Sequence, residues 1–197
     1  MDLSIVLSLH DAEPYLARLV KGLVSMTASL ARERGEPLEF EILALDERSR
    51  DNTLAILSLL SGRVDELQAF QDIPQGTAIM RASRLASGQT WLILDHDVDL
   101  ELARWATSEV MRGHRAATVS GELLALEGEL AEANLAWIRG GLVAAQREIK
   151  RALAQRGERM LRHPNPRRRA LDRIHRRARA QLARLGLARF DRPLKPG

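Results

Sequence analysis

The sequence predicts an α/β protein built on a mainly parallel sheet flanked by helices. Short, continuous apolar runs recur along the first hundred residues, as expected of strands that are buried on both faces. Each run is followed by a segment with the apolar spacing of an amphipathic helix. The connections between these segments are short, which favours parallel strands joined by right-handed crossovers.

The order of the elements follows from these patterns. Four strands are expected over residues 3–9, 40–45, 64–70 and 91–94, the third of them at an edge. Three helices are expected between them, up to residue 34 and over 53–60 and 77–87. Beyond Asp99, which is suited to cap the next helix, the composition predicts mostly helix over 122–153 and again over 168–185.

The composition limits the class of protein. At 197 residues the chain suits one domain with an appendage. It has no cysteine, which excludes disulfides and thiolate metal sites and suits a reducing compartment. No stretch approaches the roughly 18 apolar residues of a membrane span, and the opening run lacks the basic start of a signal peptide. A cytoplasmic protein, soluble or peripheral to the inner face of the membrane, is expected.

Positive charge is concentrated near the C-terminus. Residues 162–197 contain twelve arginine and lysine residues against two aspartates, whereas the whole chain has a formal net charge of +4, so residues 1–161 are acidic. This basic tail indicates an anionic partner, and its apolar stripe flanked by arginines favours an anionic membrane surface. Nucleic acid is ranked lower because the tail has a single aromatic residue, Phe190, and no recognised binding module.

The strongest chemical signal follows the fourth strand. Asp95, Asp97 and Asp99 come after the apolar run 91–94 at two-residue spacing. Ligands of open α/β sheets bind beyond the carboxyl ends of the strands. Carboxylates at such a point suit Mg²⁺ or Mn²⁺, with a phosphate completing the coordination shell. The alternative is a polar loop in which Asp99 only caps the following helix.

Acidic residues also follow the first two strands. Glu13 comes after the first, and Asp46 and Glu47 come directly after the second. Parallel strands end at one edge of a sheet, so these side chains are expected at the same rim as the aspartates of the fourth strand. Asp46 and Asp51 have a second interpretation as a helix-capping pair; ligand contact is favoured for Asp46 and capping for Asp51.

Four motifs occur in order along the chain. They are S-I-V-L-S-L-H-D-A-E at 4–13, E-I-L-A-L-D-E-R-S-R-D-N-T at 41–53, G-T-A at 76–78 with A-S-G at 86–88 and L-D-H-D at 94–97, and R-H-P-N-P-R at 162–167 running on to L-G-L-A-R-F at 185–190. In this order they resemble family 2 glycosyltransferases of the GT-A fold, most closely the dolichol- and polyprenyl-phosphate mannosyltransferase branch. The resemblance covers residues 3–99 well and 160–192 loosely.

The resemblance implies a nucleotide-sugar donor and a divalent ion, Mg²⁺ or Mn²⁺. It implies that Asp95, Asp97 and Asp99 hold the ion, with Asp97 and Asp99 as the candidate catalytic residues. The residues implied in binding the donor are Glu13, Asp46, Glu47, Gly76, Asp95, Arg167 and Arg173.

The resemblance also implies an organisation and a function. Residues 1–112 would form the nucleotide-sugar-binding core, 113–161 a shortened helical acceptor region and 162–197 the basic amphipathic tail. The implied reaction is sugar transfer, with inversion, from a UDP- or GDP-sugar to a polyprenyl phosphate or similar acceptor at the membrane face. The alternative is a catalytically inactive GT-A-like binding or scaffold protein.

The acceptor region departs from the family pattern. Many relatives read G-S-R in the acceptor loop, where this chain has G-E-L at 121–123. The acceptor arginine would then have to come from Arg115, Arg139 or Arg147.

Overall fold

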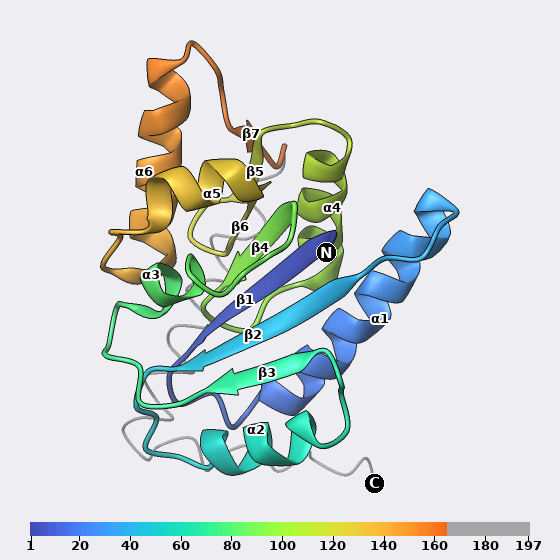
Figure 1. The fold of residues 1–197 in the computed structure, drawn as a ribbon, viewed down its shortest axis with the longest axis vertical. Helices are drawn as coiled ribbons and strands as arrows, with labels where there is room; N and C mark the ends of the chain where they lie inside the picture. The colour runs from blue at the N-terminus through green and yellow to red at the C-terminus, as the bar shows by residue number, and fades with distance from the viewer. Residues whose placement is uncertain (165–197) are drawn as a thin grey trace, which may run out of the picture. The chain divides into compact units, whose positions relative to one another are not determined.

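The computed structural model describes residues 1–164, which contain a seven-stranded sheet in the order β3-β2-β1-β4-β6-β5-β7 (Figure 1). The first four strands in the chain are parallel to one another. Their bounds are β1 (Leu3–Leu9), β2 (Phe40–Asp46), β3 (Leu67–Phe70) and β4 (Thr90–Leu94). The mainly parallel α/β fold predicted from the sequence is therefore confirmed, and β3 lies at the predicted edge.

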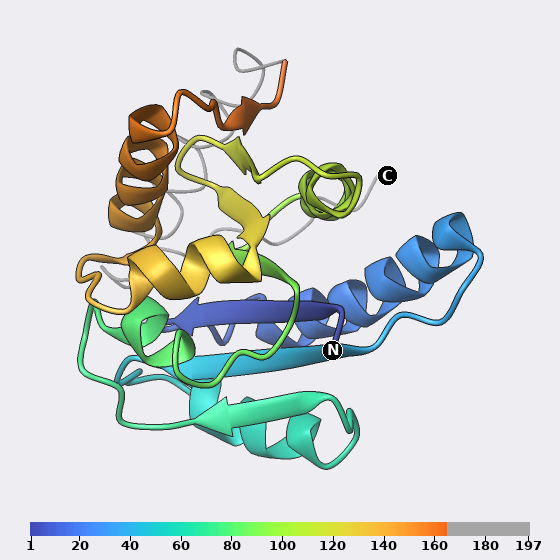
Figure 2. The same cartoon turned by 45° about the horizontal axis from the view of Figure 1, so that its top comes forward.

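Helices cover both faces of the sheet (Figure 2). One face packs against α1 (Leu16–Arg34), α2 (Thr53–Ser61) and α4 (Leu100–Met111). The other packs against α3 (Ala78–Ala82), α5 (Gly128–Leu135) and α6 (Gly141–Gln155). None of these described helices combines the length and apolar character needed to cross a bilayer.

Strand β1 lies between β2 and β4 and contributes side chains to both hydrophobic cores. Leu3, Ile5 and Leu7 are fully buried toward α1, and Val6 is fully buried toward α3 and α6. Successive side chains of a strand point to opposite faces of the sheet, so the residues of β1 alternate between the two apolar layers. Because β2 and β4 pair with β1 in parallel, the carboxyl ends of all three strands open at one edge of the sheet.

The prediction that residues 122–153 are mostly helical is wrong in its first part. β5 (Ala116–Val119) and β6 (Leu123–Glu127) form an antiparallel hairpin, β6 pairs with β4, and β7 (Leu161–Arg162) pairs with β5. Leucine, alanine and glutamate favour helix in isolation, but burial of β6 between β4 and β5 overrides that preference. These strands complete the sheet, and Met1–Arg162 form one compact unit.

The helix predicted over residues 77–87 is also shorter than expected, since α3 ends at Ala82. Ser87 donates hydrogen bonds from its amide and hydroxyl to the buried carboxylate of Glu41, at 2.8 and 2.9 Å. These bonds draw the chain away from a helical path and toward β4. The helix predicted over 168–185 lies outside the described residues.

Candidate functional site

Acidic side chains lie at the carboxyl ends of β2 and β4, on either side of β1. Asp46 and Glu47 stand at the end of β2, and Asp95 and Asp97 follow β4. Because β1 separates the two strands, their ends lie two strand spacings apart, about 10 Å. The described residues accordingly contain no group of three His, Asp or Glu side chains placed to share one metal ion.

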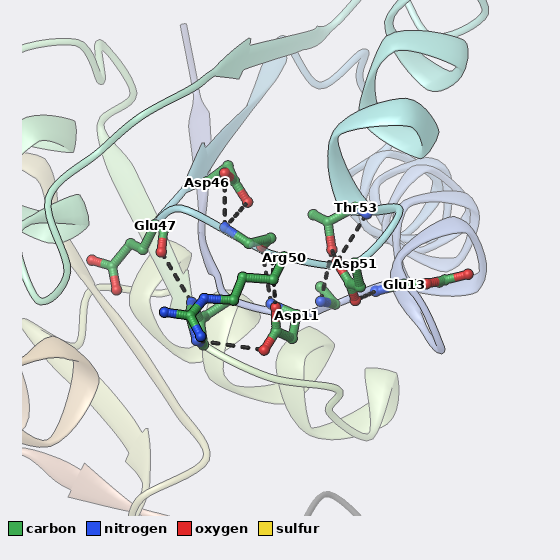
Figure 3. A network of polar contacts seen from close by, with 10 residues as sticks. Asp11, Glu13, Asp46, Glu47, Arg50, Asp51 and Thr53 are labelled. Carbon is green, nitrogen blue, oxygen red and sulfur yellow. Dashed lines mark hydrogen bonds and ion pairs between the residues drawn. The ribbon is translucent and has the colours of Figure 1, made fainter. Parts of the chain in front are cut away.

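The β2 side of the rim is tied to its neighbouring loops. Asp46 is fully buried, and its carboxylate accepts hydrogen bonds from the amide of Ser49 at 3.2 and 3.4 Å (Figure 3). Glu47 is also buried, and its Oε1 accepts a hydrogen bond from the amide of Ala78 at 2.9 Å. Ala78 is the first residue of α3, so Glu47 links the second sequence motif to the third.

A polar clasp joins the loop after β1 to the loop after β2 (Figure 3). The amide of Glu13 donates to Asp51 at 3.0 Å, and Asn52 donates from its backbone and side-chain nitrogens to the two carboxylate oxygens of Glu13, at 3.1 and 2.8 Å. The Glu13 carboxylate points away from Asp46 and Glu47. The structure therefore uses Glu13 to fix the two loops and does not bring it together with Asp46.

Asp51 caps α2 from one residue before the N-cap position, which Asn52 occupies without a capping hydrogen bond from its side chain. Its Oδ1 accepts a hydrogen bond from the amide of Thr53, the first residue of α2, at 3.0 Å. Burial raises the pKa of the Asp51 carboxyl, but hydrogen bonds from the hydroxyl and amide of Thr53 and from the amide of Glu13 outweigh it and leave this pKa below its ordinary value. Asp51 therefore stays ionised in the clasp at neutral pH.

The β4 side of the rim presents two half-buried carboxylates. Oδ2 of Asp97 accepts a hydrogen bond from Arg18 at 2.7 Å, and Oδ1 of Asp95 contacts Nδ1 of His96. A Cβ at Gly141, the first residue of α6, would lie 4.0 Å from Oδ2 of Asp95. The amino end of α6, which carries partial positive charge, thus lies next to the Asp95 side chain.

Asp99 has a different surrounding from the other two aspartates. It is exposed and is the N-cap of α4, where its Oδ1 accepts a hydrogen bond from the amide of Glu101 at 3.0 Å. The capping alternative is therefore confirmed for Asp99, and its role in metal binding stays a prediction.

Tyr15 is a residue of this rim that the sequence patterns do not indicate. It lies at the start of α1, mostly buried. Burial, and then the nearby carboxylates of Asp95, Asp97 and Asp51, raise the pKa of its phenol well above the ordinary value of 10.0. Carboxylates from both sides of the rim therefore disfavour ionisation of one phenol, which stays protonated at neutral pH.

We expect the folded protein to resist ionisation of Tyr15 and to lose stability above about pH 10. The pKa is higher in the folded than in the unfolded chain, so the stabilisation is fully present below about pH 10 and is lost as the pH rises above it. Tyr15 is the only tyrosine, so tyrosinate absorbance reports it alone. We expect tyrosinate to appear together with unfolding, and Tyr15→Phe to flatten the alkaline loss of stability. Reversible ionisation near pH 10 with native circular dichroism would contradict this account.

Comparison with solved structures identifies the fold of this chain. No protein-family model and no curated protein sequence matches the chain. A mannosyltransferase from Pyrobaculum calidifontis, solved in complex with GDP-Man and Mn²⁺, superposes with a TM-score of 0.61 at 16% identity, over 83% of this chain and 55% of that one. The chain has a GT-A fold.

A second solved structure superposes on this chain more loosely. The bifunctional IspDF from Campylobacter jejuni superposes with a TM-score of 0.52 at 11% identity, over 84% of this chain and 50% of that one. The chain therefore spans about half the length of these two proteins. At such identities the likeness establishes the fold alone.

The β5–β6 turn brings a further carboxylate to the rim of the GT-A sheet. The β4–β6 ladder ends at the pair Leu94 and Leu123. Glu122 directly precedes Leu123 and is fully buried, so it lies at the same edge of the sheet as the aspartates that follow β4. Gln146 of α6 holds this turn by accepting a hydrogen bond from the amide of Gly121 at 2.9 Å and donating one to the carbonyl of Leu123 at 2.9 Å.

The arginines considered for the acceptor lie in different surroundings. Arg115 is paired with Glu127 at the opposite edge of the sheet. Arg139 is exposed in the loop between α5 and α6, next to Gly140, whose amide donates to the carbonyl of Gly76 at 3.0 Å. Arg147 is exposed on α6. Arg167 and Arg173, which the resemblance implies in binding the donor, lie outside the described residues.

Gly76 is suited to this close approach. Its φ is +75°, and a Cβ there would lie 3.3 Å from the amide nitrogen of Gly140. Glycine therefore lets the loop before α3 and the loop before α6 meet beside the rim.

A cavity of about 920 Å³ lies away from this rim. It is bordered by the amino ends of β1 and β4 and by the carboxyl ends of α1 and α4, with Asp2, Arg34, Gly88 and Arg112 in its lining. The carboxylates at the strand ends, and not this cavity, define the candidate site, because ligands of open α/β sheets bind at the carboxyl edge.

Proposed function

We propose that the chain is a metal-dependent glycosyltransferase that uses a nucleotide sugar as its donor. The observation that carries the proposal is the half-buried pair Asp95 and Asp97 at the end of β4, with the amino end of α6 facing Asp95, in a chain with a GT-A fold. The sequence motifs support it, and so does the superposition on a mannosyltransferase solved in complex with GDP-Man and Mn²⁺.

Asp95 and Asp97 suit a divalent ion that shares its coordination shell with a diphosphate. Mg²⁺ sites of this kind use one or two carboxylates, several waters and substrate phosphates, so two carboxylates suffice. An ion held there supplies Lewis-acid stabilisation of the leaving diphosphate. The amino end of α6 adds a favourable field for the same negative charge.

The β2 side of the rim suits the nucleoside. The ends of β2 and β4 are about 10 Å apart, which matches a nucleotide lying across the end of β1 with its base beside Asp46 and its diphosphate beside Asp95. Glu47 and the clasp hold the loops on the β2 side in place, so little conformational entropy is lost there when a nucleotide binds.

The acceptor is proposed to be a phosphate carried on a lipid, as the sequence resemblance implies. A phosphomonoester is largely ionised near pH 7, so it needs positioning more than deprotonation and can displace the diphosphate in one inverting step. Arg139 offers an exposed guanidinium for that phosphate. Trp137, in the same loop with 82% of its surface exposed, offers an apolar face for the lipid chain at a membrane surface.

We expect Arg139→Gln to raise the KM for a phosphate acceptor roughly tenfold, the value of one charge-assisted hydrogen bond, without changing donor affinity. Arg147→Gln, which removes the same charge from an exposed position on α6, is the matched variant. Initial rates at varied acceptor concentration separate them. An effect of Arg147→Gln alone would assign the acceptor arginine to α6.

Calorimetry with GDP and UDP, with and without Mn²⁺, tests the proposed function directly. We expect the full chain to bind one of these nucleotides only when Mn²⁺ is present, and to transfer sugar from the corresponding nucleotide sugar. Binding of neither nucleotide in the presence of Mn²⁺ would overturn the proposal and favour the non-catalytic scaffold.

A further inference from the structure

We propose that Arg18 is the internal counter-ion of the metal site: it competes with the divalent ion for Asp97 and, once displaced, binds the donor diphosphate. The inference rests on the proposed function and adds to it a residue from outside the sequence motifs. Arg18 reaches Asp97 across 79 positions of sequence, with 2.7 Å between its guanidinium nitrogen and Oδ2 of Asp97.

The position of Arg18 in its helix is locally unfavourable. It lies in the first turn of α1, which contains no acidic residue. The amino end of a helix carries partial positive charge, so an arginine there opposes the helix dipole. Local rules are broken most often at functional sites. The carboxylate of Asp97 compensates for the position of Arg18.

The exposure of the pair makes it easy to open. The Arg18 side chain is 72% exposed and that of Asp97 is 27% exposed. Ion pairs exposed to this degree contribute little, so Arg18 can be displaced by an ion of higher charge without a large penalty. Arg18 therefore weakens metal binding moderately. When no metal is bound, its guanidinium compensates the negative charge of Asp97 and holds the carboxylate in place.

The same geometry places the displaced guanidinium beside the diphosphate. Any phosphate that shares an ion with Asp97 lies within reach of a side chain that already contacts Oδ2 of Asp97. A guanidinium binds phosphate oxygens with two parallel hydrogen bonds, which an ammonium cannot do. Arg18 thus weakens the binding of the metal ion alone but strengthens the binding of the metal ion together with the diphosphate.

Removal of Arg18 should therefore change two affinities in opposite directions. In Arg18→Gln we expect Mn²⁺ alone to bind about two- to fivefold more tightly than in the wild type. We expect GDP or UDP, at saturating Mn²⁺, to bind roughly tenfold more weakly. Arg18→Lys should return the Mn²⁺ affinity toward the wild-type value but leave the nucleotide affinity reduced, because it keeps the charge and loses the planar fork.

The experiment is calorimetric titration of the full chain with Mn²⁺ alone, and then with nucleotide at saturating Mn²⁺. Arg32→Gln is the matched control, since Arg32 is exposed on the same helix and, within the described residues, donates hydrogen bonds to Ala28 and Ser29 of that helix. Equal affinities in the wild type and Arg18→Gln, or a change that Arg32→Gln reproduces, would overturn the role of Arg18 and leave the proposed function standing. If the wild type binds neither Mn²⁺ nor nucleotide, both proposals fail.

Discussion

Asp97→Asn is expected to abolish Mn²⁺-dependent nucleotide binding and to lower sugar transfer by roughly two to three orders of magnitude, the scale on which removal of one electrostatic stabiliser acts. The amide keeps the shape of the side chain but loses the charge that a hard divalent ion requires. Folding should change little, because the pair with Arg18 is largely exposed. Calorimetry and initial rates measure the first two effects, and thermal unfolding measures the third.

Asp99→Asn separates the two interpretations of the third aspartate. Asparagine is as good an N-cap as aspartate, so α4 should keep its cap. If Asp99 only caps the helix, this variant retains Mn²⁺-dependent binding; if it holds the metal, binding falls as in Asp97→Asn. The Asp97→Asn prediction would be contradicted by Mn²⁺-dependent nucleotide binding that survives in that variant, because the donor would then bind away from Asp97.

Gly88→Ala is expected to reduce the free energy of unfolding by about 3 kcal/mol, since overpacking a rigid site is costly. A Cβ at Gly88 would lie 2.4 Å from the backbone nitrogen of Ser4 and 2.7 Å from the carbonyl carbon of Leu3. Both atoms belong to β1, which is held by β2 and β4 on its two sides and cannot shift freely. The melting temperature should fall by roughly 6–12 °C for a protein of this size.

Gly62→Ala is the matched variant for that prediction. Gly62 follows α2 with a φ of −82°, and a Cβ there would meet only the carbonyl oxygen of Leu59, at 3.8 Å. Its effect should stay within about 0.5 kcal/mol of the wild type. Equal melting temperatures for the two variants would contradict the packing described around β1.

The first half of the fold could be predicted because its strands differ in composition from its helices. β1 and β4 are short apolar runs that contain β-branched or aromatic residues (Ile5, Val6, Trp91 and Ile93) and are bounded by polar residues. β6, with the sequence L-L-A-L-E, contains only residues that favour helix, and it is a strand because β4 and β5 bury it. That information lies in the tertiary packing and not in the local sequence.

The candidate site could be predicted only as far as the strand ends. Asp95 and Asp97 follow directly from an apolar run that stops at two carboxylates. Their partners could not be predicted in this way, because Arg18 lies in α1 and Tyr15 directly before it, about 80 residues earlier, and no local pattern connects them to β4. Glu13 matched a family motif, yet both of its carboxylate oxygens accept hydrogen bonds in the clasp.

The most direct measurement is the anomalous diffraction of Mn²⁺ in a crystal of the full chain soaked with Mn²⁺ and the nucleotide diphosphate that binds. The account predicts a single peak within coordination distance of carboxylate oxygens of Asp95 and Asp97, bridged to the diphosphate. A peak elsewhere, or a nucleotide bound away from the end of β4, would contradict it.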